Sequence, residues 1–185
     1  LEEGYEAWGI PTQQQPATKT FGGVTFTVEI EGDVKGKTLY TVRWKDGRQH
    51  SKLICDGVMV KGLDEQGNRP ELTTGRVGIK VHIAGLPNGS HTLLAYHNNT
   101  DGGDFVAPPI SIDVDGVTKV TGIQQTRRAT SLSESAKSSV EFTVTDQRPV
   151  TITYYTVPVE GTTYTTTSLE LNSLEVGGDT FMALD

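Results

Sequence analysis

The stretch RWKDGRQHSK, residues 43–52, gathers positive charge and one aromatic ring in a chain whose formal net charge is −7. It holds Arg43, Trp44, Arg48 and His50, together with two lysines and a single aspartate. A guanidinium is a planar donor that matches a carboxylate, and a local cationic patch steers anionic chains to one place. The stretch predicts either a contact surface for an acidic glycan or a solvated hairpin tip.

A second polar segment, YHNNTDGGDF (96–105), follows an apolar, strand-like run. Amides and carboxylates pair with vicinal hydroxyls, and an aromatic face stacks on the C–H face of a sugar. The same oxygens suit a Ca²⁺ loop, and a plain solvated loop is the third interpretation. This segment adds six residues to the candidate site: Tyr96, His97, Asn98, Asn99, Asp101 and Asp104.

Catalytic and metal-binding motifs are missing from the sequence: it contains no HExxH, CxxC, GxSxG or P-loop pattern. His91 and His97 share a strand parity but lie about 20 Å apart along an extended strand, so they cannot hold one ion together. Cys55 stands between apolar neighbours, which is typical of a buried thiol. We therefore expect no catalysis by this chain alone and no cofactor, with a structural calcium ion left open.

Composition narrows the class of partner. Charged residues make up 21% of the chain and hydrophobic residues 35%, as in an ordinary globular protein. The negative net charge argues against a general nucleic-acid binder, which must neutralise phosphates. No apolar run approaches the roughly 20 residues that a membrane-spanning helix needs. We expect neither a nucleic acid nor a membrane span.

Short runs of alternating apolar residues, joined by turn signals, must position these side chains. Asp115-Gly116 between two such runs predicts a type I′ hairpin. In SLELNSLEV (168–176) the apolar parity changes, so we expect a bulge near Asn172-Ser173. Roughly nine or ten short strands predict an all-β fold, an antiparallel β-sandwich of the jelly-roll type. The expected strands are 24–30, 37–44, 52–60, 78–83, 91–97, 110–114, 140–144, 150–157 and 168–176.

The chain divides into two unequal parts. Residues 1–20 contain the polar stretch PTQQQPATKT and are expected to form an N-terminal linker or lead-in segment. Residues 21–185 are expected to form a single β-sandwich domain.

Several motifs follow one another in order: GVTFTVEI, KLICDGVMV, IAGLPNGSHTLLAYHNN, PISIDVDGV and SLELNSLEV. The phrase GLPNGSHTLLAYHN resembles the malectin-like and galactose-binding-like jelly rolls, in which an apolar strand precedes a Pro-Gly-type turn and a strand that ends in a polar loop. More narrowly, GYEAW followed by TFGGVTFTV and ICDGVMV resembles the accessory domain found N-terminal to polysaccharide lyases and related surface enzymes of gut bacteria. The resemblance covers roughly residues 4–185.

The resemblance implies a non-catalytic carbohydrate-binding or accessory module, periplasmic, on the cell surface or secreted. It implies a polysaccharide ligand, for which the cationic stretch favours a uronate-containing chain, and a C-terminal catalytic domain of the same polypeptide beyond residue 185. The malectin relatives that bind sugar cluster several aromatic residues on loops. Here Tyr40, Trp44 and Tyr96 share parity with apolar neighbours, so each is either core or ligand-facing. A ligand-free spacer or protein-interaction domain is the alternative, and an independent enzyme is a third class.

Overall fold

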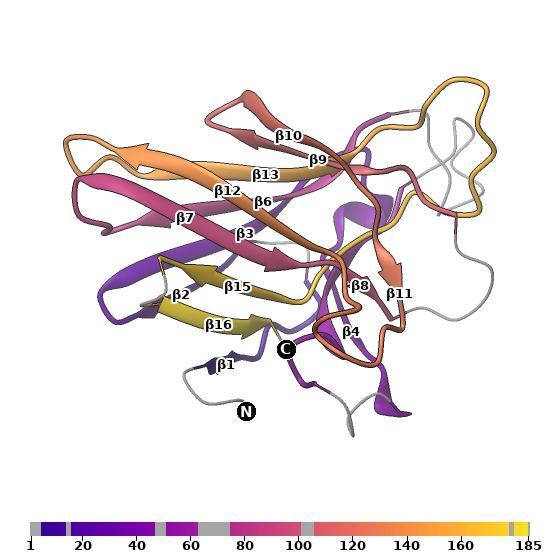
Figure 1. The fold of residues 1–185 in the computed structure, drawn as a ribbon, viewed down its shortest axis with the longest axis horizontal. Coiled ribbons are helices and arrows are strands. Elements are labelled where there is room, and N and C mark those ends of the chain that lie inside the picture. The colour runs from indigo at the N-terminus through magenta and orange to yellow at the C-terminus, as the bar shows by residue number, and fades with distance from the viewer. Residues whose placement is uncertain are drawn as a thin grey trace.

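Nearly all of the regular structure is β-strand, as the ribbon in Figure 1 shows. The computed structural model describes residues 5–13, 16–46, 51–62, 75–100, 106–177 and 180–184. A short 3₁₀ turn, η1 (Lys35–Lys37), precedes the fourth strand. Within the described ranges, no helix is long and apolar enough to cross a bilayer.

Two large sheets form the layers of the fold (Figure 1). The six-stranded sheet has the spatial order β10 (Val117–Ile123), β9 (Ile110–Val114), β13 (Val150–Thr156), β6 (Val77–Ala84), β3 (Val24–Gly32) and β2 (Ala17–Phe21). The five-stranded sheet has the order β1 (Glu6–Trp8), β16 (Thr180–Leu184), β15 (Ser173–Val176), β7 (Gly89–Tyr96) and β12 (Lys137–Val144). Two small sheets lie at one end: β14 (Leu169–Leu171), β5 (Asp56–Val60) and β4 (Tyr40–Arg43), and β8 (Asn98–Asn99) with β11 (Thr126–Arg127).

One hydrophobic core lies between the two large sheets. On β6 the side chains of Ile79, Val81 and Ile83 are buried, while Lys80 and His82 are partly exposed. This period of two places every second side chain in the core, as the sequence pattern predicts. The predicted all-β antiparallel β-sandwich is confirmed. The predicted inward residues of β9 and β12 are also buried: Ile110, Ile112, Val114, Val140, Phe142 and Val144.

The hairpin between β9 and β10 confirms the turn predicted at Asp115-Gly116. Val114 pairs with Val117 across the turn. Asp115 has φ 48° and Gly116 has φ 82°. Two positive φ angles at the central positions are the requirement of a type I′ turn, whose twist matches that of the strands.

The parity change near the end of the chain marks a switch between sheets. Leu171 of β14 pairs with Val58 of β5 in the three-stranded sheet. Leu174 of β15 pairs with Ala95 of β7 in the five-stranded sheet. Asn172 lies between the two strands and is fully buried. The predicted bulge is therefore a break between two strands, because hydrogen bonds to the Asn172 side chain hold the chain at this point.

The segment 1–20, expected as a linker or lead-in, contributes strands to both large sheets. β1 pairs in parallel with β16, and β2 pairs antiparallel with β3. Trp8, Ile10 and Ala17 are buried in the main core. β1 has only three residues and β2 follows a Pro- and Gln-rich stretch, so the composition of the segment conceals both strands.

Candidate functional site

β4 carries Arg43 to one end of the three-stranded sheet, and Trp44 follows directly. The backbone N–H of Trp44 donates to the carbonyl of Cys55 at 2.8 Å, which holds the chain after β4 beside β5. Arg43 Nε lies 3.3 Å from Asp56 Oδ1, and the two side chains are 49% and 10% exposed. The carboxylate therefore orients the arginine while half of the Arg43 side chain stays in solvent.

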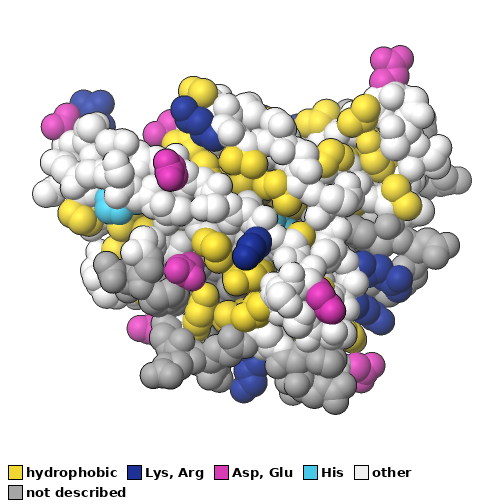
Figure 2. Space-filling view, in the orientation of Figure 1, with side chains coloured by type: hydrophobic (Ala, Val, Ile, Leu, Met, Phe, Trp, Pro, Cys, Tyr) yellow, Lys and Arg dark blue, Asp and Glu magenta, His cyan; other side chains and the backbone are white. Residues whose placement is uncertain are grey.

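A second guanidinium reaches Trp44 from the segment after β11. Arg128 lies over the Trp44 ring, 5.6 Å from its centroid, where the ring quadrupole attracts a cation. Arg128 Nε donates to the carbonyl of Thr100 at 3.0 Å. In Figure 2, Lys and Arg side chains gather on the right, where Figure 1 places β11. One guanidinium, that of Arg128, thus lies over the partly exposed Trp44, while Arg43 precedes Trp44 in the chain and pairs with Asp56.

A small hydrophobic cluster, separate from the main core, supports this surface. Its buried members are Leu53, Ile54 and Ala129. Tyr96 packs against the cluster and is partly buried, as are Tyr5 and Leu132. Tyr96 therefore supports the surface and presents only part of its ring to solvent.

A groove of about 480 Å³ adjoins Arg43. It is lined by Gly9, Ile10, Pro11, Thr41, Val42 and Arg43. The Thr41 hydroxyl pairs with the Thr12 hydroxyl at 2.9 Å. The volume falls within the range of about 300–1,000 Å³ that small-ligand sites occupy. The groove and the Trp44 surface together form the candidate site.

Behind the candidate site lies a buried cluster, which we call the Asn172 network: His97, Asn98, Thr100, Glu170 and Asn172. Asn172 Oδ1 accepts from the Asn98 N–H at 2.6 Å. Asn172 Nδ2 donates to Glu170 Oε1 at 3.0 Å and to the Asn98 carbonyl at 3.1 Å. Glu170 Oε2 accepts from the Thr100 N–H at 2.8 Å and its hydroxyl at 3.1 Å. These bonds satisfy groups whose burial without partners would be costly.

Asn98 connects the network to the surface. Its Nδ2 donates to the carbonyl of Ile54 at 2.8 Å. Its Oδ1 accepts from the N–H of Ala129 at 2.8 Å. Ile54 precedes the residue that binds the Trp44 backbone, and Ala129 follows Arg128. Asn98 is therefore a positioning residue for both segments of the candidate site.

The structure corrects three of the predicted ligand contacts. His97, Asn98 and Asn99 are each 0% exposed, so their side chains do not reach a ligand on the surface. Asn99 Nδ2 donates to Ser168 Oγ at 3.3 Å, and His97 and Asn98 bond within the network. Polar side chains are stable in the interior when such partners satisfy them. The predicted polar loop thus begins with buried structural residues.

The other predicted contacts fall into two groups. Arg43 is exposed and Trp44 is partly exposed, and Tyr96, also partly exposed, packs against the small hydrophobic cluster. Four lie outside the described residues: Arg48, His50, Asp101 and Asp104. Sequence analysis missed Arg128, whose signal was the dibasic pair Arg127-Arg128, and it missed the buried role of Asn172 behind the parity change.

A histidine–serine pair in the interior has the outline of a nucleophile with its base. His97 Nε2 lies 2.8 Å from Ser138 Oγ. Both residues are buried, and burial lowers the pKa of His97 to about 4, opposed by a backbone hydrogen bond at Glu170. Burial also raises the pKa of the neighbouring Tyr154, whose ring centroid lies 5.5 Å from that of His97. The pair is enclosed by the sandwich, which fits a structural role.

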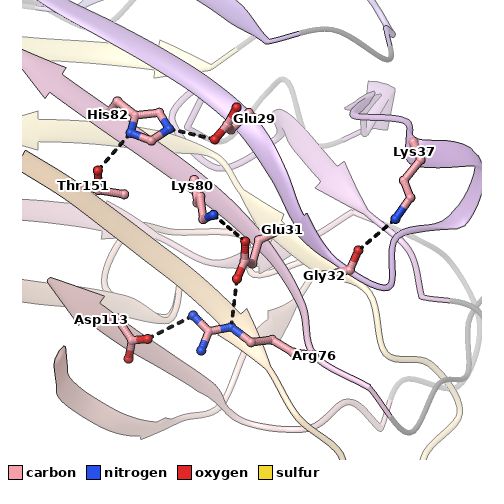
Figure 3. Close-up of polar contacts among 9 residues, drawn as sticks. All are labelled: Glu29, Glu31, Gly32, Lys37, Arg76, Lys80, His82, Asp113 and Thr151. Carbon is pink, nitrogen blue, oxygen red and sulfur yellow. Dashed lines mark hydrogen bonds and ion pairs between the residues drawn. The ribbon is translucent and has the colours of Figure 1, made fainter. Parts of the chain in front are cut away.

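The outer face of the six-stranded sheet carries a second polar cluster, which we call the Arg76 ladder: Glu29, Glu31, Arg76, Lys80, His82 and Asp113 (Figure 3). Arg76 Nη2 lies 2.9 Å from Asp113 Oδ2, and Arg76 Nε lies 3.5 Å from Glu31 Oε1. Lys80 Nζ lies 2.7 Å from Glu31 Oε2. Cross-strand pairs of opposite charge stabilise a sheet modestly.

The ladder borders a groove of about 410 Å³. The Arg76 guanidinium stacks on the Tyr155 ring, 3.5 Å from its centroid. Partial burial acts to raise the pKa of Asp113, but hydrogen bonds from Thr118, Arg76 and Tyr155 hold it below its ordinary value. The charged lining residues are Arg76, Lys80, Glu31, Asp113 and Asp115. With three carboxylates against two cations, this groove does not attract an acidic ligand.

Metal ligands do not converge in the described part of the chain. Within it, no group of three or more His, Cys, Asp or Glu side chains could hold a metal ion. The calcium ion left open for the loop 96–105 involves residues outside this set and stays a prediction.

Comparison with known proteins yields no family assignment. No family model matches the sequence, and no curated protein matches it. One similar solved structure is an exo-β-1,3-galactanase from Phanerochaete chrysosporium with β-1,3-galactotriose. Its TM-score is 0.41 at 16% sequence identity, and the match covers 80% of this chain and 27% of that chain. Another is a GH31 α-xylosidase from Xanthomonas citri, with a TM-score of 0.30, 11% identity, and coverage of 80% and 16%. This chain spans less than a third of either neighbour, and likenesses this low carry no argument about function.

Proposed function

We propose that this chain is a non-catalytic carbohydrate-binding module whose ligand lies on the surface around Trp44. The observation that carries the proposal is the Arg128 guanidinium over the partly exposed Trp44 ring, next in the chain to Arg43, which lines an open groove of about 480 Å³. An indole ring stacks on the C–H face of a sugar, and guanidinium groups supply planar pairs of donors. Stacking and directional hydrogen bonding are the two requirements of sugar recognition.

The ligand that fits this surface best is an acidic glycan such as a uronate polymer. Arg43 and Arg128 match the bidentate geometry of a carboxylate. In a chain of net charge −7, local positive potential at this end also steers an anionic polymer to the site. Exposed charge pairs are individually weak, so we expect dissociation constants of roughly 10 µM to 1 mM.

The proposal assigns no catalysis to this chain. The His97–Ser138 pair is buried, and the charged side chains of the Arg76 ladder are paired with one another. The module would hold polysaccharide for a catalytic domain of the same polypeptide, outside the cell or in the periplasm. The resemblance of the sequence to accessory domains of exported polysaccharide-degrading enzymes supports this role and this location.

Calorimetric titration of oligogalacturonates against the chain, with neutral cello-oligosaccharides of the same length, tests the proposal. We expect binding of the uronates, and weaker binding at 1 M salt, where the Debye length falls to about 3 Å. Arg128→Ala and Trp44→Ala should each weaken binding about tenfold, close to 1.4 kcal/mol. Arg43→Lys keeps a cation next to Asp56 but removes the planar fork, so it should weaken binding without unfolding the protein.

Arg148→Ala is the matched control, because Arg148 is highly exposed in the hairpin between β12 and β13 and its nearest carboxylate lies 3.9 Å away. Its affinity should equal that of the unmodified chain. Equal binding of neutral and acidic glycans would show that the cationic surface is only a hairpin tip. No binding to any glycan would favour the spacer, and release of reducing or unsaturated ends would contradict the absence of catalysis.

A further inference from the structure

The two large sheets end in four edge strands: β10 and β2 on one sheet, and β1 and β12 on the other. An edge strand presents unpaired backbone donors and acceptors to any strand that approaches it. Natural proteins therefore protect their edges by shortening, bulging or covering them. The four edges of this sandwich differ sharply in that respect.

Three of the edges carry such protection. β1 has only three residues, and β2 has five. Lys19 of β2 donates from Nζ to the carbonyl of Ala7 at 2.7 Å, so the backbone of β1 lies close to that edge. β10 is interrupted by register shifts between Thr118 and Val120 and between Val120 and Ile123.

β12 carries none of these features. It runs for eight residues, Lys137–Val144, and pairs with β7 in unbroken register, without Gly or Pro. Its buried and exposed residues alternate without exception. Among the described strands none is hydrogen-bonded to its second edge, although β10 of the six-stranded sheet lies close to β12. The exposed side chains are Lys137, Ser139, Glu141 and Thr143.

The outer side chains of β12 are complementary to a copy of themselves. In a symmetric antiparallel pair with Ser139 opposite Ser139, each Lys137 faces a Glu141 across the interface. Centring the pair on Glu141 would place two carboxylates opposite each other, which is unfavourable. In the part of the chain that the structure describes, neither Lys137 nor Glu141 forms an ion pair. Charge therefore favours the register centred on Ser139, in which both Lys137–Glu141 pairs form.

We propose that β12 is a self-pairing edge and that two copies of this chain form a symmetric dimer through it. The two five-stranded sheets then continue into one another, with a two-fold axis at Ser139. Such an interface is isologous, because the same surface contributes from both copies. Backbone hydrogen bonds between the two β12 strands supply the attraction, and the two Lys137–Glu141 pairs determine the register.

Sedimentation of the full chain over a wide concentration range measures the dimer. We expect a dissociation constant of about 100 µM or tighter, as for a weak interface. Lys137→Glu and Glu141→Lys should each weaken self-association by at least about tenfold, because each creates two like-charge pairs. The double variant should restore it, and an equimolar mixture of the two single variants should form a heterodimer. Lys119→Glu on the interrupted strand β10 is the matched charge reversal and should change nothing.

A cysteine at the two-fold axis tests the register directly. Directly opposed residues of an antiparallel pair have Cβ atoms about 4.5–5.5 Å apart, close to the roughly 3.5–4.5 Å of a disulfide. Ser139→Cys should therefore form a covalent dimer under mild oxidation, whereas Thr143→Cys should not; native Cys55 is buried and does not compete. A chain that stays monomeric, charge reversals without effect, or equal cross-linking of both cysteines would overturn the proposal.

Discussion

The Asn172 network and the Arg76 ladder are both clusters of polar side chains contributed by several strands, and they differ in their access to water. Every member of the network is buried, and its bonds run to backbone groups as well as side chains. The ladder lies on an outer sheet face, where the side chains of Arg76, Lys80 and His82 remain 33–36% exposed. The polar groups of the network therefore cannot turn to water for a hydrogen bond, whereas the partly exposed side chains of the ladder can.

The difference separates two uses of polar residues in one sandwich. In the network, each removed group leaves a buried partner unsatisfied, so the arrangement is fixed and can position the segments that carry Trp44 and Arg128. On the ladder, a removed group is replaced by water at small cost. Substitutions in the two regions should thus differ in size, in pH dependence and in response to salt.

Asn172→Ala should give the largest effect. It removes the acceptor of the Asn98 N–H and the donor to Glu170, both buried. Because a buried group left unsatisfied costs about 1–3 kcal/mol, we expect the free energy of unfolding to fall by about 3 kcal/mol or more. Urea denaturation measures it. Asn88→Ala, which removes one exposed bond to the Gln147 N–H, is the control and should cost about 0.5 kcal/mol. Equal losses of unfolding free energy in the two variants would contradict the difference between buried and exposed hydrogen bonds.

Acid should act through His97 of the network before it acts through Asp113 of the ladder. Unfolded His97 binds a proton below about pH 6.5, but folded His97 does so only below about pH 4. The contribution of neutral His97 to the free energy of unfolding is therefore complete above pH 6.5. It is lost as the pH falls to 4, and the loss amounts to at most about 3 kcal/mol. Asp113, whose folded pKa is lowered, loses its contribution only at more acidic pH. NMR titration of the His97 ring checks this, and a midpoint near 6.5 would contradict it.

Arg76→Met should cost less, because Arg76 is partly exposed, Asp113 keeps its hydrogen bond from Thr118, and the variant keeps much of the side-chain volume. We expect a loss of about 1 kcal/mol in the free energy of unfolding, from the pairs to Asp113 and Glu31. Arg148→Met, at the exposed hairpin, should fall within about 0.5 kcal/mol of zero. A loss as large as that of Asn172→Ala would mean that the ladder is a structural network too.

Salt should give the smallest effect. Raising NaCl to 1 M shortens the Debye length to about 3 Å, so the cost of Arg76→Met should shrink by about 0.5 kcal/mol. The cost of Asn172→Ala rests on buried hydrogen bonds between mostly uncharged groups and should stay constant. Denaturation of both variants at two salt concentrations measures the difference. A salt-sensitive Asn172→Ala would point to water reaching Glu170.

The fold was predictable because its signals are local. The alternation of Ile79, Val81 and Ile83 marks an inward face within six residues, and Asp115-Gly116 specifies its own turn. The network was not predictable in this way. Asn98 reads as a loop residue, and only its contact with Asn172, 74 positions away, explains its burial.

The candidate site was predictable in part for the same reason. Arg43 and Trp44 were identified from their unusual local charge, and they lie on the surface. Arg128 became part of the site only because the Asn98 side chain binds the Ala129 N–H beside it. No pattern within either segment records that pairing.

The parallel pairing of β1 with β16 has a consequence for the newly made chain. Glu6 is paired with Met182, and Trp8 with Leu184. The first strand of the five-stranded sheet therefore cannot pair until the last strand has been synthesised. Contacts between such distant residues slow folding. At synthesis rates of about 5–20 residues per second, Trp8 has no partner strand for roughly ten to thirty seconds. During that interval its indole ring is available to chaperones and to other nascent chains.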